Sequence, residues 1–174
     1  VELFNMLCAK QLPFVLFRLP QTQEIILYQQ QDKKQYTTNN LKNNGFVFAP
    51  FKTQKKFLYI PKTECKSIPI PKLEKEVSKS PKKVYENNKD YYFELVNKAK
   101  NTIDTDNLKK VVVSRQHEYK FSGSLGVSFL KLIHAYPNAM VYYWSHFGTG
   151  DWMGASPETL LHVEHGVCAT MALA

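Results

Sequence analysis

The pattern of apolar and polar residues predicts a series of short strands in the first third of the chain. Segments rich in aromatic and β-branched residues are separated by prolines and by a polar stretch over residues 29–44, which is typical of strands joined by turns. Before them, apolar residues at helical spacing predict a helix that ends before Pro13. The expected strands cover residues 14–19, 24–28, 45–51 and 56–60.

The second half of the chain has a clearer periodicity. Apolar residues from Tyr92 to Ile103 form one stripe of an amphipathic helix, with Asp90 as its candidate N-cap. A valine-rich strand is expected over residues 109–115. A second helix follows, with Ser122 or Ser124 as its N-cap and a stop at Pro137. Antiparallel strands are expected over residues 140–145, 152–155, 160–164 and 167–173, the last two flanking a His165-Gly166 turn.

This order of elements indicates an α+β fold, with an antiparallel or mixed sheet and helices packed on it. Between the two halves, four prolines stand among lysines, so neither a helix nor a central strand is expected there. The sequence therefore predicts a strand-rich part over residues 1–60, a connector over 61–88 and a core over 89–174. Because the chain stops within an expected strand, we expect it to be a fragment of a longer protein.

Composition places the chain among ordinary globular proteins. Of its 174 residues, 44% are hydrophobic and 22% are charged, and no apolar run approaches the roughly 20 residues of a membrane-spanning helix. Three cysteines, Cys8, Cys65 and Cys168, lack the spacing of a metal site or a disulfide framework. We expect them to be buried as small hydrophobic side chains. A cytoplasmic location without a membrane partner is the expectation.

The net charge of +8 is concentrated in one segment. Residues 52–83 contain ten lysines, three glutamates and no arginine, whereas recognition of nucleic acids commonly uses arginine and stacking aromatic residues. A solvated connector is therefore favoured, and no nucleic-acid partner is expected. A lysine-rich binding module for an acidic partner stays open as the alternative to an enzyme.

The histidines give no metal motif. His162 and His165 are three residues apart, and on an expected strand this spacing puts them on opposite faces. A zinc pair is therefore not expected.

Two motifs are similar to those of the chorismate-utilising enzymes, which include the isochorismate, salicylate, anthranilate and aminodeoxychorismate synthases. They are Lys110-Val-Val-Val-Ser-Arg115 and Gly154-Ala-Ser-Pro-Glu158, whose glutamate lies 43 residues after Arg115. The last five residues, 170–174, resemble the start of a third family motif, and three motifs in order are specific. The resemblance is firm over residues 91–174 and looser over 45–51. It implies roughly the first half of an enzyme with the anthranilate synthase component I-like, chorismate-binding fold.

The resemblance also implies roles for individual residues. Lys110 corresponds to the general base that activates water, and Glu158 to the general acid that protonates the leaving C4 hydroxyl of chorismate. If both faces of the valine strand are covered, desolvation lowers the pKa of Lys110, which suits a base. Ala172, Leu173 and Ala174 would begin a substrate-binding motif. Mg²⁺ is implied for the complete enzyme, with ligands beyond residue 174.

A lysine at position 110 favours the water-using branch of the family. The favoured hypothesis is an isochorismate synthase that serves menaquinone or siderophore biosynthesis. The expected partners are chorismate and the missing C-terminal half of the same protein, without an amidotransferase subunit. A salicylate or anthranilate synthase-type enzyme remains the alternative within the family.

Overall fold

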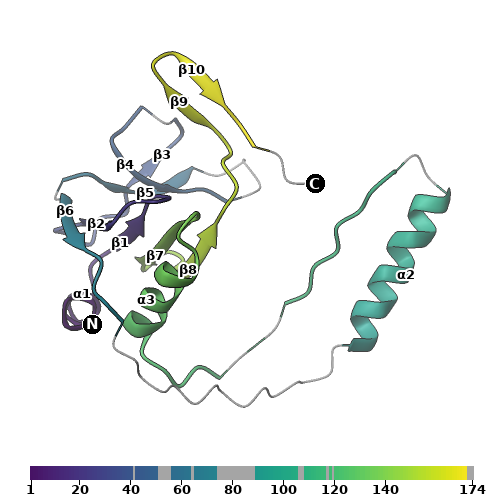
Figure 1. Ribbon diagram of the computed structural model, residues 1–174, viewed down its shortest axis with the longest axis horizontal. Helices are drawn as coiled ribbons and strands as arrows, with labels where there is room; N and C mark the ends of the chain where they lie inside the picture. Colours follow the sequence, from purple (N-terminus) through teal and green to yellow (C-terminus); the bar gives the residue numbers. More distant parts are fainter. Residues whose placement is uncertain are drawn as a thin grey trace. The chain divides into compact units, whose positions relative to one another are not determined.

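The computed structural model describes residues 1–40, 42–50, 56–63, 65–73, 89–105, 108–116, 118 and 120–171 (Figure 1). The chain forms two compact units, and each is described by itself. One unit combines Val1–Glu74 with Gly123–Ala174, and the other is Lys75–Ser122. The division into parts over residues 1–60, 61–88 and 89–174 stays a prediction.

The first unit is built on a five-stranded antiparallel sheet in which segments far apart in the sequence are neighbours. The strand β1 lies at its centre and pairs with β2 on one side and with β7 on the other, so that Phe14 lies opposite both Gln29 and Ser145. The order is β6-β2-β1-β7-β8. The bounds are β1 Phe14–Arg18, β2 Glu24–Gln29, β6 Cys65–Pro69, β7 Met140–His146 and β8 Gly150–Ser156.

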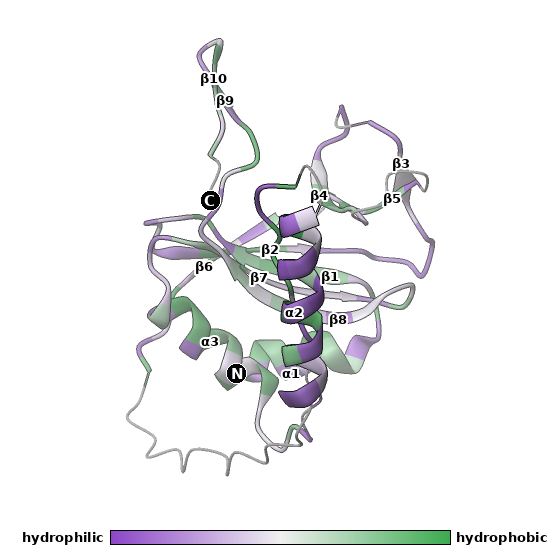
Figure 2. Cartoon of the chain, turned by 90° about the vertical axis from the view of Figure 1, so that its right-hand side faces the viewer, coloured by the Kyte–Doolittle hydropathy of each residue, from purple (hydrophilic) through white to green (hydrophobic). Residues whose placement is uncertain are grey.

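Two helices, α1 (Glu2–Lys10) and α3 (Leu125–Ala135), cover one face of this sheet, the lower one in Figure 2. Phe4 of α1 packs edge-on against the ring of Tyr143, at 4.7 Å between centroids. The alternation of side chains along β1 sends Phe14 and Leu16 to this helical side. Burial of such apolar surface is the main stabilising contribution in a fold of this kind.

A small three-stranded sheet covers the opposite face. Trp144 is completely buried there, and its ring stacks on Phe48 at 5.0 Å between centroids. Its indole Nε1 donates a hydrogen bond to Thr149 Oγ1 at 2.9 Å, as a buried tryptophan requires. The small sheet has the order β3-β5-β4, with β3 Thr37–Thr38, β4 Gly45–Phe48 and β5 Phe57–Pro61.

A hairpin of β9 (His162–Glu164) and β10 (Val167–Ala169) ends the first unit. Its turn residues His165 and Gly166 have φ angles of 49° and 79°. Two successive positive φ angles are the conformation of a type I′ turn, which matches the twist of a two-residue hairpin. Every residue of both strands is exposed.

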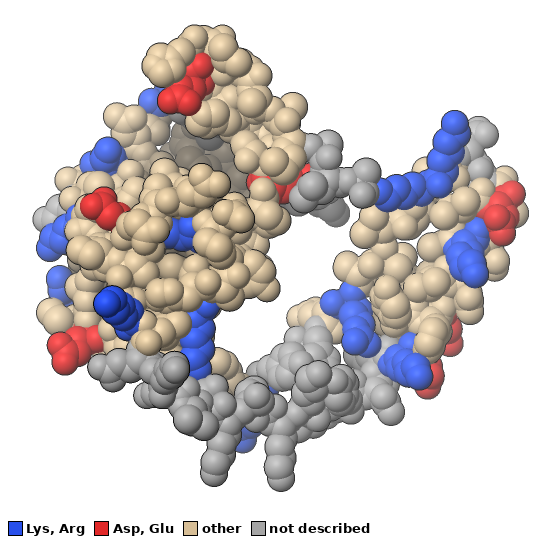
Figure 3. All heavy atoms as spheres, in the orientation of Figure 1, with Lys and Arg blue, Asp and Glu red and all other residues tan. Residues whose placement is uncertain are grey.

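The second unit contains α2 (Lys89–Thr105). The expected apolar stripe is half-buried, and no residue of α2 is fully buried. Positive and negative side chains are interspersed along this helix (Figure 3). Asp90 lies in its first turn instead of capping it, because the helix already includes Lys89. An acidic side chain in that turn is still favourable, since the N-terminal end of a helix carries partial positive charge.

Most of the expected elements are confirmed, including the α+β class with antiparallel sheets. One expectation, that the cysteines are buried, is wrong, and the segment between the halves contains an edge strand. The expected connector contains β6, which pairs with β2 from Glu24 opposite Pro69 to Tyr28 opposite Cys65; as an edge strand it tolerates its proline. All three cysteines are exposed, because Cys65 lies on that edge strand, Cys168 on the exposed hairpin and Cys8 on the outer side of α1.

None of the described helices has the length and apolar character to cross a bilayer.

Candidate functional site

The structure places Glu158 in an exposed turn directly after β8. The sheet ends here because Pro157 follows Ser156 and has no N–H group to extend the ladder. Ser156 Oγ donates a hydrogen bond to the carbonyl oxygen of Glu158 at 3.3 Å. On the far side of the turn, the N–H of Met171 donates to the carbonyl of Thr159 at 2.8 Å. The backbone around Glu158 is therefore held at both ends.

Gly154, at the start of the same motif, is required by a close approach. It lies opposite Tyr142 in the β7–β8 register, and a Cβ atom at Gly154 would come within 3.0 Å of the tyrosine ring. A larger residue would push this ring or the strand aside. The glycine therefore leaves room for the ring of Tyr142 over β8, the strand that ends just before the turn with Glu158.

The expected strand over residues 109–115 is wrong. Residues 108–116 form neither helix nor strand, and Lys110 is exposed. An extended segment becomes a strand only when its backbone groups pair with a neighbour, and no described residue pairs with this one. Val112 is 83% exposed, so the described residues do not cover the face of this segment that carries Val112.

One side chain ties this segment to the helix of its own unit. The guanidinium of Arg115 lies over the ring of Tyr92, 5.7 Å from the centroid, within the range of a cation–π contact. This contact joins the segment over residues 108–116 to α2.

The predicted site residues are distributed over both units. Lys110 belongs to Lys75–Ser122 and Glu158 to the unit of the five-stranded sheet, so their meeting at one substrate stays a prediction. Ala172, Leu173 and Ala174 lie outside the described residues.

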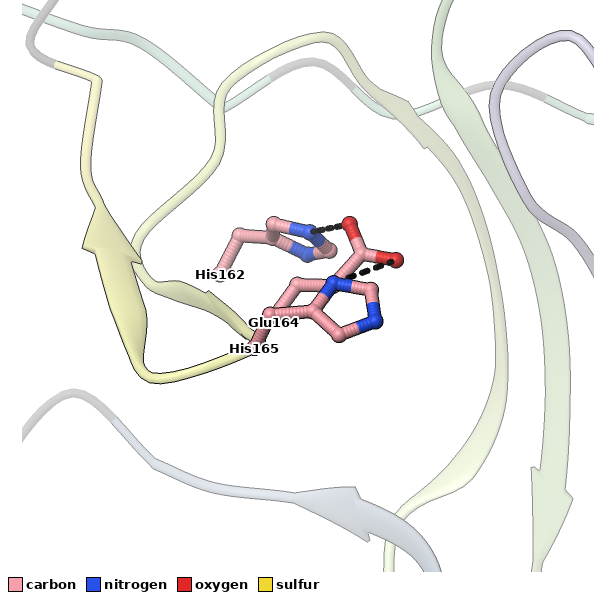
Figure 4. Close-up of polar contacts among 3 residues, drawn as sticks. All are labelled: His162, Glu164 and His165. Atoms are coloured by element: carbon pink, nitrogen blue, oxygen red, sulfur yellow. Dashed lines mark hydrogen bonds and ion pairs between the residues drawn. The ribbon is translucent and has the colours of Figure 1, made fainter.

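A cluster of two histidines and a glutamate on the β9–β10 hairpin corrects the expectation for His162 and His165. Both rings approach Glu164, with 3.3 Å from His162 Nε2 to Oε2 and 4.0 Å from His165 Nδ1 to Oε1 (Figure 4). The strand rule does not apply to His165, because it lies in the turn with a positive φ angle. These side chains are mostly exposed, and ion pairs of this kind add little stability.

Burial changes the pKa of two residues on β7. Burial lowers the pKa of His146, whose Nδ1 accepts a hydrogen bond from the N–H of Gly148 at 2.9 Å. Burial, together with the nearby carboxylate of Asp151, raises the pKa of Tyr143. Sequence reasoning missed His146, since no spacing motif marks it; its pairing with Gly150 of β8 and its stacking on buried Trp144 became visible only in the sheet.

The sequence profile of the chorismate binding enzymes matches residues 6–174. The chain belongs to this family. The match of this chorismate-binding enzyme thus extends well beyond the motif-bearing second half, into α1 and the central sheet. No curated protein matches the chain, and no solved structure matches it either.

Chorismate-binding enzymes generally use Mg²⁺. Within the described part of the chain, no three acidic, histidine or cysteine side chains are grouped so that they could hold a metal ion. These described residues therefore do not fit a magnesium site.

Proposed function

We propose that this chorismate-binding enzyme is an isochorismate synthase, which moves the hydroxyl group of chorismate from C4 to C2. The observation that carries the proposal is the lysine at position 110, at the head of the Lys110–Arg115 motif, together with Glu158 in the second motif. A lysine there favours water over ammonia as the nucleophile. We also propose a cytoplasmic location and activity without an amidotransferase subunit.

In the proposed reaction Lys110 is the general base. It removes a proton from water, whose oxygen forms a bond to C2 of chorismate while the ring double bond shifts. Lys110 acts in the neutral amine form, which becomes an ammonium when it takes the proton. The exposed position of Lys110 in the described structure leaves its side-chain nitrogen accessible to a ligand. Lys109, its neighbour, is exposed as well and is given no role.

Glu158 is the proposed general acid. It donates its proton to the C4 hydroxyl, which leaves as water when the C4–O bond breaks. One water enters and one departs, so substrate and product are isomers. The turn that carries Glu158 is held by backbone contacts at both ends, which suits a group that must meet one oxygen atom.

The test is Lys110→Ala in the enzyme that contains this chain, with Lys109→Ala as the matched control. General-base catalysis is worth about 10²- to 10⁴-fold, so we expect isochorismate formation to fall by that factor while the melting temperature is unchanged. The control should keep full activity. Turnover of Lys110→Ala within a few-fold of wild type would show that the base lies elsewhere.

A second variant tests the acid. Glu158→Gln keeps the shape of the side chain but has no proton to donate, so kcat should fall while KM stays near wild type. Glu164→Gln, on the exposed hairpin, is its control and should leave kcat unchanged. Release of salicylate or anthranilate as the product of the wild-type enzyme would contradict the proposed reaction directly.

A further inference from the structure

A buried arginine lies at the end of β1. Arg18 is only 1% exposed, and its side chain points to the helical face of the sheet, where α3 ends. Nη1 donates hydrogen bonds to the carbonyls of Leu19 at 3.1 Å and of Pro137 at 2.5 Å. Nη2 donates to the carbonyl of Tyr136, also at 2.5 Å. These bonds attach β1 to the C-terminal end of α3.

The positive charge of Arg18 has no counter-charge in the described structure. None of the described carboxylates lies within ion-pair distance of its guanidinium. Nε is buried and has no acceptor among those residues. Carbonyl dipoles at a helix C-terminus offset part of the charge, but a buried charge without a partner remains unfavourable.

A small cleft adjoins Arg18. Its volume is about 150 Å³, and Arg18 itself forms part of the wall. Gln21, Thr22 and Gln23 from the β1–β2 turn also line it. The two glutamines bring side-chain amides, whereas the hydroxyl of Thr22 donates to the carbonyl of Leu19 at 2.9 Å. Among the described residues that line the cleft, none is acidic. The volume fits an anion of a few heavy atoms.

We propose that this cleft binds a small oxyanion, a carboxylate or phosphate group, as the missing counter-ion of Arg18. Such groups match the planar donor arrangement of a guanidinium. The site shares no residue with the proposed catalytic pair and does not depend on the reaction proposed above. Its occupant also stabilises the attachment of β1 to α3, because it neutralises the charge at their junction.

Thermal unfolding of the full chain tests the proposal. Phosphate and acetate are titrated separately at millimolar concentration, against chloride at the same ionic strength. A ligand that binds only the folded state raises the melting temperature in a saturable way, so we expect such a rise with at least one oxyanion and none with chloride. A rise with phosphate alone assigns a phosphate group, and a rise with acetate alone assigns a carboxylate.

Isosteric variants supply the counter-charge from the chain itself. Gln21→Glu and Gln23→Glu each place a carboxylate in the cleft, so we expect a higher melting temperature in chloride and loss of the oxyanion response. Gln31→Glu adds the same charge at an exposed position and should keep the response. Arg18 is left intact, because its substitution also removes three structural hydrogen bonds. Equal oxyanion responses in wild type and the two cleft variants, or no response in wild type, would overturn the proposal.

Discussion

Two segments have high β propensity, residues 14–17 and residues 111–113, but only the first forms a strand. Phe14–Arg18 is buried at every position and is paired on both sides. The three valines form no strand, and Val112 is almost fully exposed. The difference shows that β propensity describes how well a side chain fits a covered sheet, and that a strand exists only where neighbours supply backbone partners. The helix α2 in the same unit forms without fully buried residues, because its hydrogen bonds are internal.

The largest expected difference between these segments is in amide hydrogen exchange. Amides of β1 should exchange only when the sheet unfolds, several orders of magnitude more slowly than those of residues 108–116. Peptide-resolved mass spectrometry of the exchanging chain measures both segments in one experiment. Comparable protection of the two segments would contradict this prediction and would mean that residues 108–116 have a strand partner.

Core substitutions should separate the two units in stability. Trp144→Ala removes a completely buried ring and its stacking on Phe48, so the free energy of unfolding should fall by about 3–5 kcal/mol. Leu95→Ala on the half-buried stripe of α2 should cost less than about 1 kcal/mol. Urea unfolding of both variants measures this. A similar loss for Leu95→Ala would place α2 in a cooperative core.

Acid should weaken the sheet unit through His146. Burial lowers its pKa in the folded state, so the unfolded chain binds the proton more readily. The stabilising contribution is complete above the unfolded pKa of about 6.5, and it is lost as the pH falls below that value. His146→Asn keeps an acceptor for the N–H of Gly148 but cannot titrate.

Urea midpoints between about pH 7.5 and 5 measure this effect, since the range spans the unfolded histidine pKa. The wild type should lose stability toward the acid end more steeply than His146→Asn. His165→Asn, which changes a largely exposed ring, is the control and should follow the wild type. Parallel profiles for wild type and His146→Asn would contradict the prediction.

The smallest expected effect concerns the start of α3. Ser124 caps this helix by accepting a hydrogen bond from the N–H of Val127 at 3.4 Å. Because the bond is long, Ser124→Ala should cost about 0.5–1 kcal/mol, the lower part of the usual range. Ser122→Ala, at the other cap position that the sequence allowed, should have almost no effect. Thermal melts of the two variants distinguish them, and equal losses would remove Ser124 as the cap.

Local patterns were sufficient for much of the fold. The helix before Pro13, the stripe from Tyr92 to Ile103, and the His165-Gly166 turn each follow from residues close in sequence. Such elements are governed by internal hydrogen bonds, prolines and turn conformations, all of which are local. The motifs around Lys110 and Glu158 likewise placed the chain in its family from sequence alone.

Tertiary structure decided the features that depend on distant partners. The sheet order puts β1 beside β7, more than 120 residues later, where Arg18 lies opposite Val141 and is buried. It made β6 an edge strand, left the cysteines exposed and left residues 108–116 unpaired within the described chain. A short stretch of sequence gives the polarity of each residue but not the distant residues that pack against it. Burial and strand pairing both depend on those distant residues.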